Sequence, residues 1–374
     1  MPETDPILVT RSSMPPFEEY IKEIAPLWKS HWLTNMGVKH KEFQKLLCNY
    51  LNVDHVALFA NGHSALECII EAMQLGADGH KKVITTPFTF ASTTHAIVRK
   101  GLIPVFADIK EDDYTLDPKS IEALMDKDVC AIIPVHVYGN ICDVKAIHTI
   151  ANDWKVKVIY DAAHAFGVKV NGTSVAQFGD ASMFSFHATK VFNTIEGGGI
   201  CFKDPDLLDV LNQWKNFGIT GPESVEYIGG NAKMNEFCAA MGICNLRHVD
   251  DEIAKRKMVA QRYWKYLNHV KGIRLCIPNE STEYNYAYLP VLFEDSFGAS
   301  RDDVFNALAK HNIKARKYFY PLVSDFSCYR NCFDSAETPV AQHASSHILT
   351  LPMYADLDLA DVDRICHIVL SCKQ

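Results

Sequence analysis

The sequence has no uninterrupted apolar run of about 20 residues, the length that a membrane-spanning helix needs. Its first residues, MPETDPILVT, include acidic side chains and no apolar stretch of signal-peptide length. The formal net charge is −8, whereas proteins that bind nucleic acid usually present a basic face. We therefore expect a cytoplasmic protein that has neither a membrane nor nucleic acid as its main partner.

Paired cysteine motifs are also missing. The 12 cysteines are scattered, no CxxC occurs, and the closest late pair is Cys328 and Cys332. A disulfide framework is therefore not expected. Most of these thiols should be small buried hydrophobic side chains in a reducing compartment.

Short β-rich runs alternate with amphipathic helical segments through the first half of the chain. This alternation predicts an α/β fold in which a mostly parallel sheet is covered on both faces. The length of 374 residues suits one large domain and a smaller one. The predicted strands lie at 55–60, 81–87, 102–109, 129–139 and 156–161.

The second half of the chain has a different pattern of predicted elements. The segment 219–235 predicts a long polar loop, and 236–270 predicts one long helix that leads into a second domain. We place the boundary near residue 250. This gives a large α/β domain over 1–250 and a smaller C-terminal α+β domain over 251–374.

Lys190 lies between a compact apolar run and a run of three glycines, in GDASMFSFHATKVFNTIEGGGI over 179–200. The ordinary interpretation is a lysine whose stem packs at the edge of the core. Its uncharged neighbourhood and the glycine-rich turn favour a functional lysine. We hypothesise that it forms a Schiff base with pyridoxal phosphate (PLP), and that its freed amine, with a lowered pKa, moves protons.

Two other features fit this hypothesis. Asp161 ends a strand that looks buried, where open parallel sheets form ligand sites. It is either a helix cap or a buried carboxylate that keeps the pyridine nitrogen of PLP protonated. The NGHS turn at 61–64 offers backbone N–H groups and a helix dipole to a phosphate, although most such turns only connect. Ser185 adds a hydroxyl, but its SxF pattern is also common in strands.

Eight segments in order carry a family resemblance: FANGHSALE, PFTFAST, PVFADI, VHVYGN, YDAAHAFG, SMFSFHATK, EGGGI and GGNAKMNEFCAAMG. Together they resemble the PLP-dependent sugar aminotransferases of the DegT/DnrJ/EryC1/StrS type. The likeness runs from about residue 30 to the RKYFYPL and LPMY segments. It implies an aspartate aminotransferase-like fold, fold type I, in a homodimer with shared active sites.

The resemblance also implies roles for individual residues. Lys190 would be the Schiff-base lysine, Asp161 would pair with the pyridine nitrogen, and His164 would lie beside O3′ of the cofactor. The further cofactor contacts would be Gly62, His63, Ser64, Phe90 and Ser185. Asn231 would reach across the dimer to the cofactor phosphate of the partner subunit. Lys233, Tyr318 and Tyr320 are candidate substrate contacts, since aromatic rings with hydroxyls suit stacking and hydrogen bonding.

Some of these roles have alternatives. His164 and Phe90 would otherwise be core residues, and the two tyrosines would pack between domains. His63 stands where the family usually has threonine, which leaves a backbone contact but puts a side-chain role in doubt. Lys233 stands where arginine is common and cannot make a bidentate contact. Phe90 replaces the tryptophan or tyrosine of some members and keeps a stacking face.

Competing functions can be weighed on the same residues. Relatives that dehydrate sugars at C3 have histidine at the position of Lys190, so this lysine favours transamination. A metal hydrolase built from His136, His164 and His187 would match no HExxH-like pattern. A non-enzymatic PLP-binding regulator would not need the whole set that includes Asp161 and Glu196.

The substrate is indicated by three segments: the one that begins SSMPPFEEYIKEIAP, NVDHVALFANGHSAL and RKYFYPL. They look most similar to viosamine-type enzymes, which transfer the amino group of L-glutamate to C4 of dTDP-4-keto-6-deoxy-D-glucose. Such enzymes supply sugars for O-antigen or antibiotics. A 3-keto nucleotide-sugar aminotransferase is the main alternative.

Overall fold

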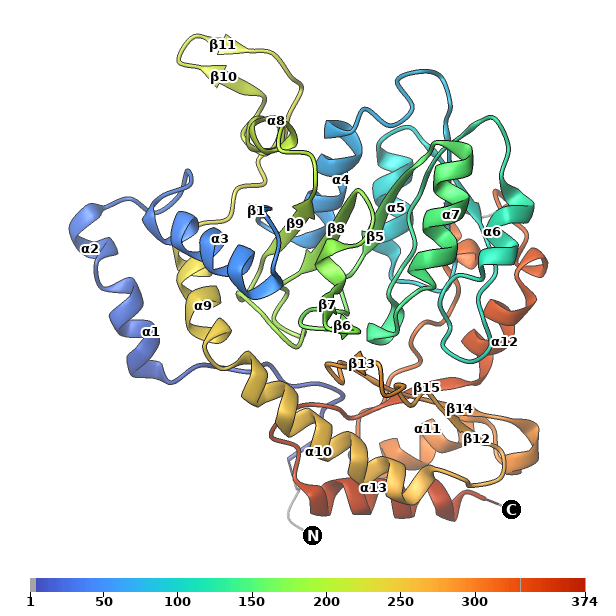
Figure 1. The fold of residues 1–374 in the computed structure, drawn as a ribbon. Coiled ribbons are helices and arrows are strands. Elements are labelled where there is room, and N and C mark those ends of the chain that lie inside the picture. Colours follow the sequence, from blue (N-terminus) through green and yellow to red (C-terminus); the bar gives the residue numbers. More distant parts are fainter. Residues whose placement is uncertain (1–4, 330, 374) are drawn as a thin grey trace.

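A mixed, mostly parallel sheet forms the centre of the fold (Figure 1). In this computed structural model, which describes residues 5–329 and 331–373, the sheet has seven strands. In order across the sheet they are β1 (His55–Phe59), β9 (Gly198–Phe202), β8 (Ala181–Ser185), β5 (Lys157–Asp161), β4 (Val129–Ile132), β2 (Lys82–Thr85) and β3 (Ile103–Phe106). Within the described sheet, β9 alone runs opposite to the other six strands. The predicted large, mostly parallel sheet is confirmed.

Thirteen helices lie within the described residues, and they cover the central sheet or pack with the smaller one. They are α1 (Phe17–Ile24), α2 (Leu27–Ser30), α3 (Val38–Leu51), α4 (Gly62–Ala72), α5 (Ala91–Arg99), α6 (Pro118–Leu124), α7 (Val144–Trp154), α8 (Leu207–Trp214), α9 (Glu236–Leu246), α10 (Val249–Leu267), α11 (Arg301–Lys310), α12 (Pro339–His347) and α13 (Leu359–Ser371). None of them, within the described residues, is long and apolar enough to cross a membrane.

The side chains of β1 alternate between two helical layers, as the geometry of a strand requires. Ala57 and Phe59 pack in one apolar core with residues of α4, α5 and α8. Val56 and Leu58 belong to another core, which residues of α3 and α9 complete. The edge of the sheet that carries the site therefore lies between two packed layers, which fixes the positions of the strand ends.

A second sheet packs with α10, α11 and α13 below the first (Figure 1). Its antiparallel strands are β12 (Ile273–Leu275), β14 (Leu289–Phe293) and β15 (Ile348–Leu351). The N-terminal segment joins this core: Ile7 N–H donates to the Asn312 carbonyl at 3.1 Å, and Met353 N–H donates to the Val9 carbonyl at 3.0 Å. The division near residue 250 stays a prediction, and the segment around Ile7 packs with residues on the C-terminal side of it.

Two local expectations differ from the structure. The single helix predicted over 236–270 is two helices, α9 and α10, with Arg247 and His248 between them. The predicted polar loop over 219–235 contains a small hairpin of β10 (Ile219–Gly221) and β11 (Ser224–Val225), which extends from the body of the fold (Figure 1).

The remaining short strands join the two parts of the molecule. β13 (Thr282–Glu283) pairs with β6 (Lys169–Val170), which in turn pairs with β7 (Thr173–Ser174). The expectation that most thiols are buried holds only in part: five of the 12 free cysteines are buried, five are partly exposed and two are exposed. The buried ones are Cys68, Cys142, Cys201, Cys244 and Cys366.

Candidate active site

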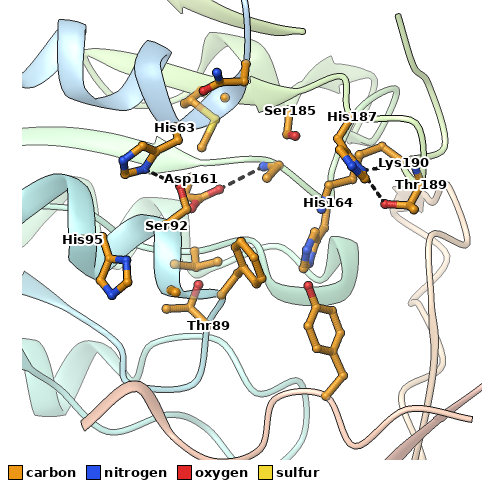
Figure 2. A pocket seen from close by; sticks show the side chains of 18 of the residues that line it. His63, Thr89, Ser92, His95, Asp161, His164, Ser185, His187, Thr189 and Lys190 are labelled. Atoms are coloured by element: carbon orange, nitrogen blue, oxygen red, sulfur yellow. Dashed lines mark hydrogen bonds between the residues drawn. The ribbon is translucent and has the colours of Figure 1, made fainter. Parts of the chain in front are cut away.

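The ends of three strands meet at one edge of the central sheet. β1 and β8 both pair antiparallel with β9, so they run parallel to each other, and β5 runs parallel to β8. Their carboxyl ends therefore bring together the turn at 61–64, Asp161 and Ser185. A cavity of about 630 Å³ opens at this edge. Figure 2 shows the side chains that converge on it from α4, α5 and the loops after β5 and β8.

Most of the predicted site residues line this cavity. They are Gly62, His63, Phe90, Asp161, His164, Ser185, Lys190 and Tyr318. Ser64, Asn231, Lys233 and Tyr320 are not among its lining residues. Phe90 is 52% exposed, so it is not a core residue, and its ring is open to a ligand.

Asp161 holds a buried carboxylate whose two oxygens each accept one hydrogen bond. Thr93 Oγ1 donates to Oδ2 at 2.7 Å, and the Ala163 N–H donates to Oδ1 at 3.1 Å. Burial raises the pKa of Asp161, while these hydrogen bonds and the charge of Lys190 oppose the rise. The structure thus has a desolvated carboxylate that is oriented by fixed donors.

Lys190 lies across the cavity from His63 and His95 (Figure 2). Burial of its amine lowers the pKa of Lys190, whereas Tyr318 and Asp161 favour the charged form and Arg316 disfavours it. The Lys190 Nζ atom lies 3.5 Å from the hydroxyl of Tyr288. A lysine with a lowered pKa is suited to nucleophilic and proton-transfer chemistry.

His164 is held as a neutral imidazole. Its Nδ1 atom accepts a hydrogen bond from the Tyr138 N–H at 3.0 Å, and its ring stacks on Phe319 with the planes 1° apart. Burial lowers the pKa of His164 well below its usual value. Because Nδ1 is an acceptor, the neutral ring carries its proton on Nε2 and can donate from there.

The turn at the start of α4 has the features of an anion cradle. The Asn61 side chain caps the helix by accepting from the Ser64 N–H at 2.8 Å, so that N–H is already used. Gly62 and His63 occupy the first turn, where N–H groups have no partner inside the helix. A Cβ at Gly198, which pairs with the ends of β1 and β8, would lie 2.5 Å from the Asn61 carbonyl carbon. Glycine is therefore required behind the cradle.

The other predicted residues lie outside the cavity lining. Lys233 Nζ donates to the Asn216 Oδ1 at 2.7 Å and to the Asn231 Oδ1 at 3.0 Å, so these residues form their own surface cluster. Tyr320 is 54% exposed, and its ring lies 4.9 Å from the guanidinium of Arg301.

Several residues of the site were not predicted from the sequence. Thr93 binds Asp161, and Ser92 lies 2.9 Å from the Nδ1 of His63. Arg316 lines the cavity with its guanidinium 4.2 Å from the Tyr318 ring. The PFTFAST segment contains Ser92 but carries no local signal for these contacts, which join distant parts of the chain.

The three histidines considered for a metal site have separate partners. His136 accepts from the Cys142 N–H and stacks on Tyr160, whereas His187 contacts Thr189. Within the described ranges, no group of three or more histidine, cysteine or acidic side chains is arranged to hold a metal ion.

The central sheet, its helices and the smaller sheet define a fold type I transferase. The chain belongs to the DegT/DnrJ/EryC1/StrS aminotransferase family, because a sequence model of that family matches residues 17–370. It is therefore an enzyme of the transaminase type, and the resemblance read from the sequence is confirmed.

Two curated relatives are similar over almost their whole length. The chain is 42% identical over 368 residues to a Shigella dysenteriae protein named dTDP-4-amino-4,6-dideoxy-D-glucose transaminase, with 98% of this chain and 99% of the relative covered. An Escherichia coli protein of the same name is 38% identical over 370 residues, with 98% of each chain covered.

Solved structures show the same fold. The structure of DesI in the presence of its TDP-sugar product superposes with a TM-score of 0.92 at 30% identity, covering 99% of this chain and 93% of that one. Helicobacter pylori PseC, an aminotransferase involved in the biosynthesis of pseudoaminic acid, gives 0.93 at 25% identity, with 99% of each chain covered.

Proposed function

We propose that the protein transfers the amino group of L-glutamate to C4 of a dTDP-4-keto-6-deoxy-hexose. The product would be dTDP-4-amino-4,6-dideoxy-D-glucose, a precursor for O-antigen or a related glycan. The main observation that supports this chemistry is that Lys190 and the buried carboxylate of Asp161 line one cavity. The substrate is supported by 42% identity to a transaminase named for that amino sugar.

The residues present fit PLP. The first turn of α4 offers N–H groups and a positive dipole end to a phosphate, with the hydroxyl of Ser185 beside it in the cavity lining. Asp161 offers a desolvated carboxylate to the pyridine nitrogen, and His164 offers its Nε2 proton to O3′. Phe90 offers an open aromatic face for stacking.

Asp161 and Lys190 have different roles in this reaction. PLP, when bound, supplies the ring that withdraws electrons from the reacting carbon. Asp161 keeps a proton at the pyridine nitrogen because its negative charge favours the protonated form. Lys190 Nζ would bind the cofactor and, once released, would move the proton from Cα of glutamate to C4′ of the cofactor. Its lowered pKa keeps a share of the amine neutral and able to act as a base.

The substrate is tested by supplying L-glutamate with dTDP-linked 4-keto and 3-keto sugars and identifying the products by NMR. Amination at C4 is expected. Amination at C3 alone would instead establish the 3-keto aminotransferase. If neither sugar is aminated, both aminotransferase proposals are overturned and a PLP-binding regulator is favoured. Lys190→Ala is the matched control: it should lose turnover and the absorbance that borohydride reduction removes, with an unchanged fold.

We also infer a homodimer with shared active sites. Large apolar side chains of helices α1 to α3 and of the loop between α2 and α3 are exposed, which is unusual for a monomer surface; they are Phe17, Trp28, Trp32, Leu33 and Val38. Ile228, which follows the β10–β11 hairpin, is 96% exposed. Helices α1 to α3 and the β10–β11 hairpin both lie toward the left of Figure 1. Asn231, which is exposed, is proposed to contact the phosphate bound by the partner.

Mixing two inactive variants tests this sharing. Lys190→Ala and Asn231→Asp damage different residues of one site, so a heterodimer with shared sites has one intact site. After unfolding and refolding together, the mixture should recover about a quarter of the wild-type activity by random pairing of subunits. If no activity is recovered, the proposal that both subunits contribute to each site is contradicted.

The buried thiols agree with a cytoplasmic, reducing location.

A further inference from the structure

The hydroxyl of Tyr288 is a close neighbour of Lys190 that the roles above leave unused. Tyr288 precedes β14 in the smaller part of the molecule, and its hydroxyl lies 3.5 Å from Lys190 Nζ. Its ring centroid lies 6.0 Å from the same Nζ atom and 4.6 Å from the ring of His164. One tyrosine therefore lies beside both Lys190 and His164.

The Tyr318 ring packs beside that of Tyr288. The two ring centroids are 5.7 Å apart, and the Tyr318 side chain helps hold down the pKa of Tyr288. Tyr318 is itself fixed, because the Tyr138 hydroxyl donates to its backbone carbonyl and the Arg316 guanidinium lies 4.2 Å from its ring. The oxygen of Tyr288 is thus held in place while it faces Lys190.

Burial keeps the proton of Tyr288 in place. It raises the pKa of Tyr288 to about 12, although Arg316, Tyr318 and Arg256 oppose the rise. Burial lowers the pKa of Lys190, so the lysine changes its protonation while the tyrosine stays neutral. A neutral hydroxyl can accept a hydrogen bond from the ammonium form and donate one to the free amine, whereas a phenyl ring can do neither.

We propose that Tyr288 is a positioning residue for Lys190: its hydroxyl receives the amine when the lysine is released and holds it for proton transfer at Cα of the substrate. This inference rests on the proposed function, since it takes Lys190 as the lysine that binds PLP. The released amine needs a polar partner because its burial disfavours the charged form. The Tyr288 hydroxyl provides it without a change in covalent bonding.

Tyr288→Phe removes one oxygen and keeps the ring, and Tyr286→Phe is its matched control. Tyr286 is in the same segment and buried, but its ring packs on Tyr284 and Trp264. The first measurement uses the protein without cofactor. Lys190 is acetylated with acetic anhydride at a series of pH values, and the modified peptide is counted by mass spectrometry. Tyr288→Phe should lower the pKa of Lys190, because the ammonium form loses its acceptor. Tyr286→Phe should leave it unchanged.

The second measurement uses the PLP-loaded enzyme in a single turnover with L-glutamate. Tyr288→Phe should slow the step roughly tenfold, the loss of one hydrogen bond to a charged group, with little change in the glutamate concentration at half-maximal rate. Tyr318→Phe should change both measurements in the same direction by less. It also serves as the test if melting curves followed by circular dichroism show that Tyr288→Phe does not fold.

An unchanged titration of Lys190 in Tyr288→Phe, or an equal shift in Tyr286→Phe, would overturn the inference. The labelling needs neither a sugar nor turnover. A shifted titration in an enzyme that aminates no sugar would therefore leave the Tyr288–Lys190 contact established and remove the proposed function instead.

Discussion

Thr93→Val tests how the carboxylate of Asp161 is held. The substitution replaces a hydroxyl with a methyl group of similar size. Thr93 Oγ1 donates to Asp161 Oδ2 at 2.7 Å, and Thr93 and Asp161 are 0% and 4% exposed. Water therefore cannot replace the lost donor. Thr94→Val is a matched control, because Thr94 is the next residue, is also buried, and has an Oγ1 with no hydrogen-bond partner in the described part of the chain.

The expected loss follows from the charge on the acceptor. A hydrogen bond to a charged group contributes about 1.5–3 kcal/mol, so Thr93→Val should lower the free energy of unfolding of the cofactor-free protein by about 2 kcal/mol near neutral pH. Burial raises the pKa of Asp161 above its ordinary value of 3.8. Between the ordinary and the raised pKa, the folded state holds more protons than the unfolded state, so stability falls as pH rises through this window.

Thr93→Val raises the pKa of Asp161 further, because it removes a donor that favours the ionised form. The loss in free energy of unfolding that Thr93→Val causes should therefore grow as pH rises. It should be smallest in acid, where Asp161 is protonated. Urea unfolding from about pH 5 to about pH 8, followed by tryptophan fluorescence, measures this trend. Thr94→Val should stay within about 0.5 kcal/mol of wild type. Equal losses in the two variants, or a Thr93→Val loss that does not vary with pH, would refute the reasoning.

Three further predictions test other parts of the site. Asp161→Asn should slow the reaction with glutamate severely, because a neutral amide does not favour the protonated pyridine nitrogen; a near-normal rate in stopped flow would remove that role. Gly198→Ala should lower the free energy of unfolding by about 1–3 kcal/mol, because its Cβ would lie 2.6 Å from the Asn61 carbonyl oxygen. It should also weaken PLP binding, measured by fluorescence titration. Lys215 is buried, and its pKa is lowered to about 7. Between about pH 7 and the ordinary pKa of 10.5, the unfolded state holds more protons than the folded state, so the free energy of unfolding of the wild type should rise with pH. Urea unfolding of Lys215→Met should not show this rise.

The edge of the sheet that carries the site could be predicted from the sequence. Asp161 and Ser185 end strands and Gly62 begins a helix, and the carboxyl ends of parallel strands share an edge. Local sequence is enough for this result, because strand alternation and turn residues are local features.

Contacts between distant elements could not be predicted in this way. Thr93 is an ordinary residue in a helical segment, and its bond to Asp161 depends on how α5 packs on the sheet. The break between α9 and α10 has no glycine or proline to mark it. There, Arg247 and His248 both contact Glu19 of α1, so tertiary contacts override the local helical pattern.

Asn231 and Lys233 illustrate a different limit. The sequence similarity gives them a role beside a phosphate, but in the single chain they bind each other and Asn216. A residue that is proposed to act across a subunit interface is not brought to its ligand by the packing of its own chain. The subunit-mixing experiment is needed for that reason.

The docking of the N-terminal segment bears on how the protein is made. Ile7 pairs with the Asn312 carbonyl and Val9 with Met353, so a segment that is synthesised before the central sheet binds residues that are synthesised after it. The central sheet, whose strands end at Phe202, can assemble on the ribosome while this segment is still unpaired. The smaller part of the molecule can be completed only after Met353 has been synthesised, when the segment around Ile7 meets its partners.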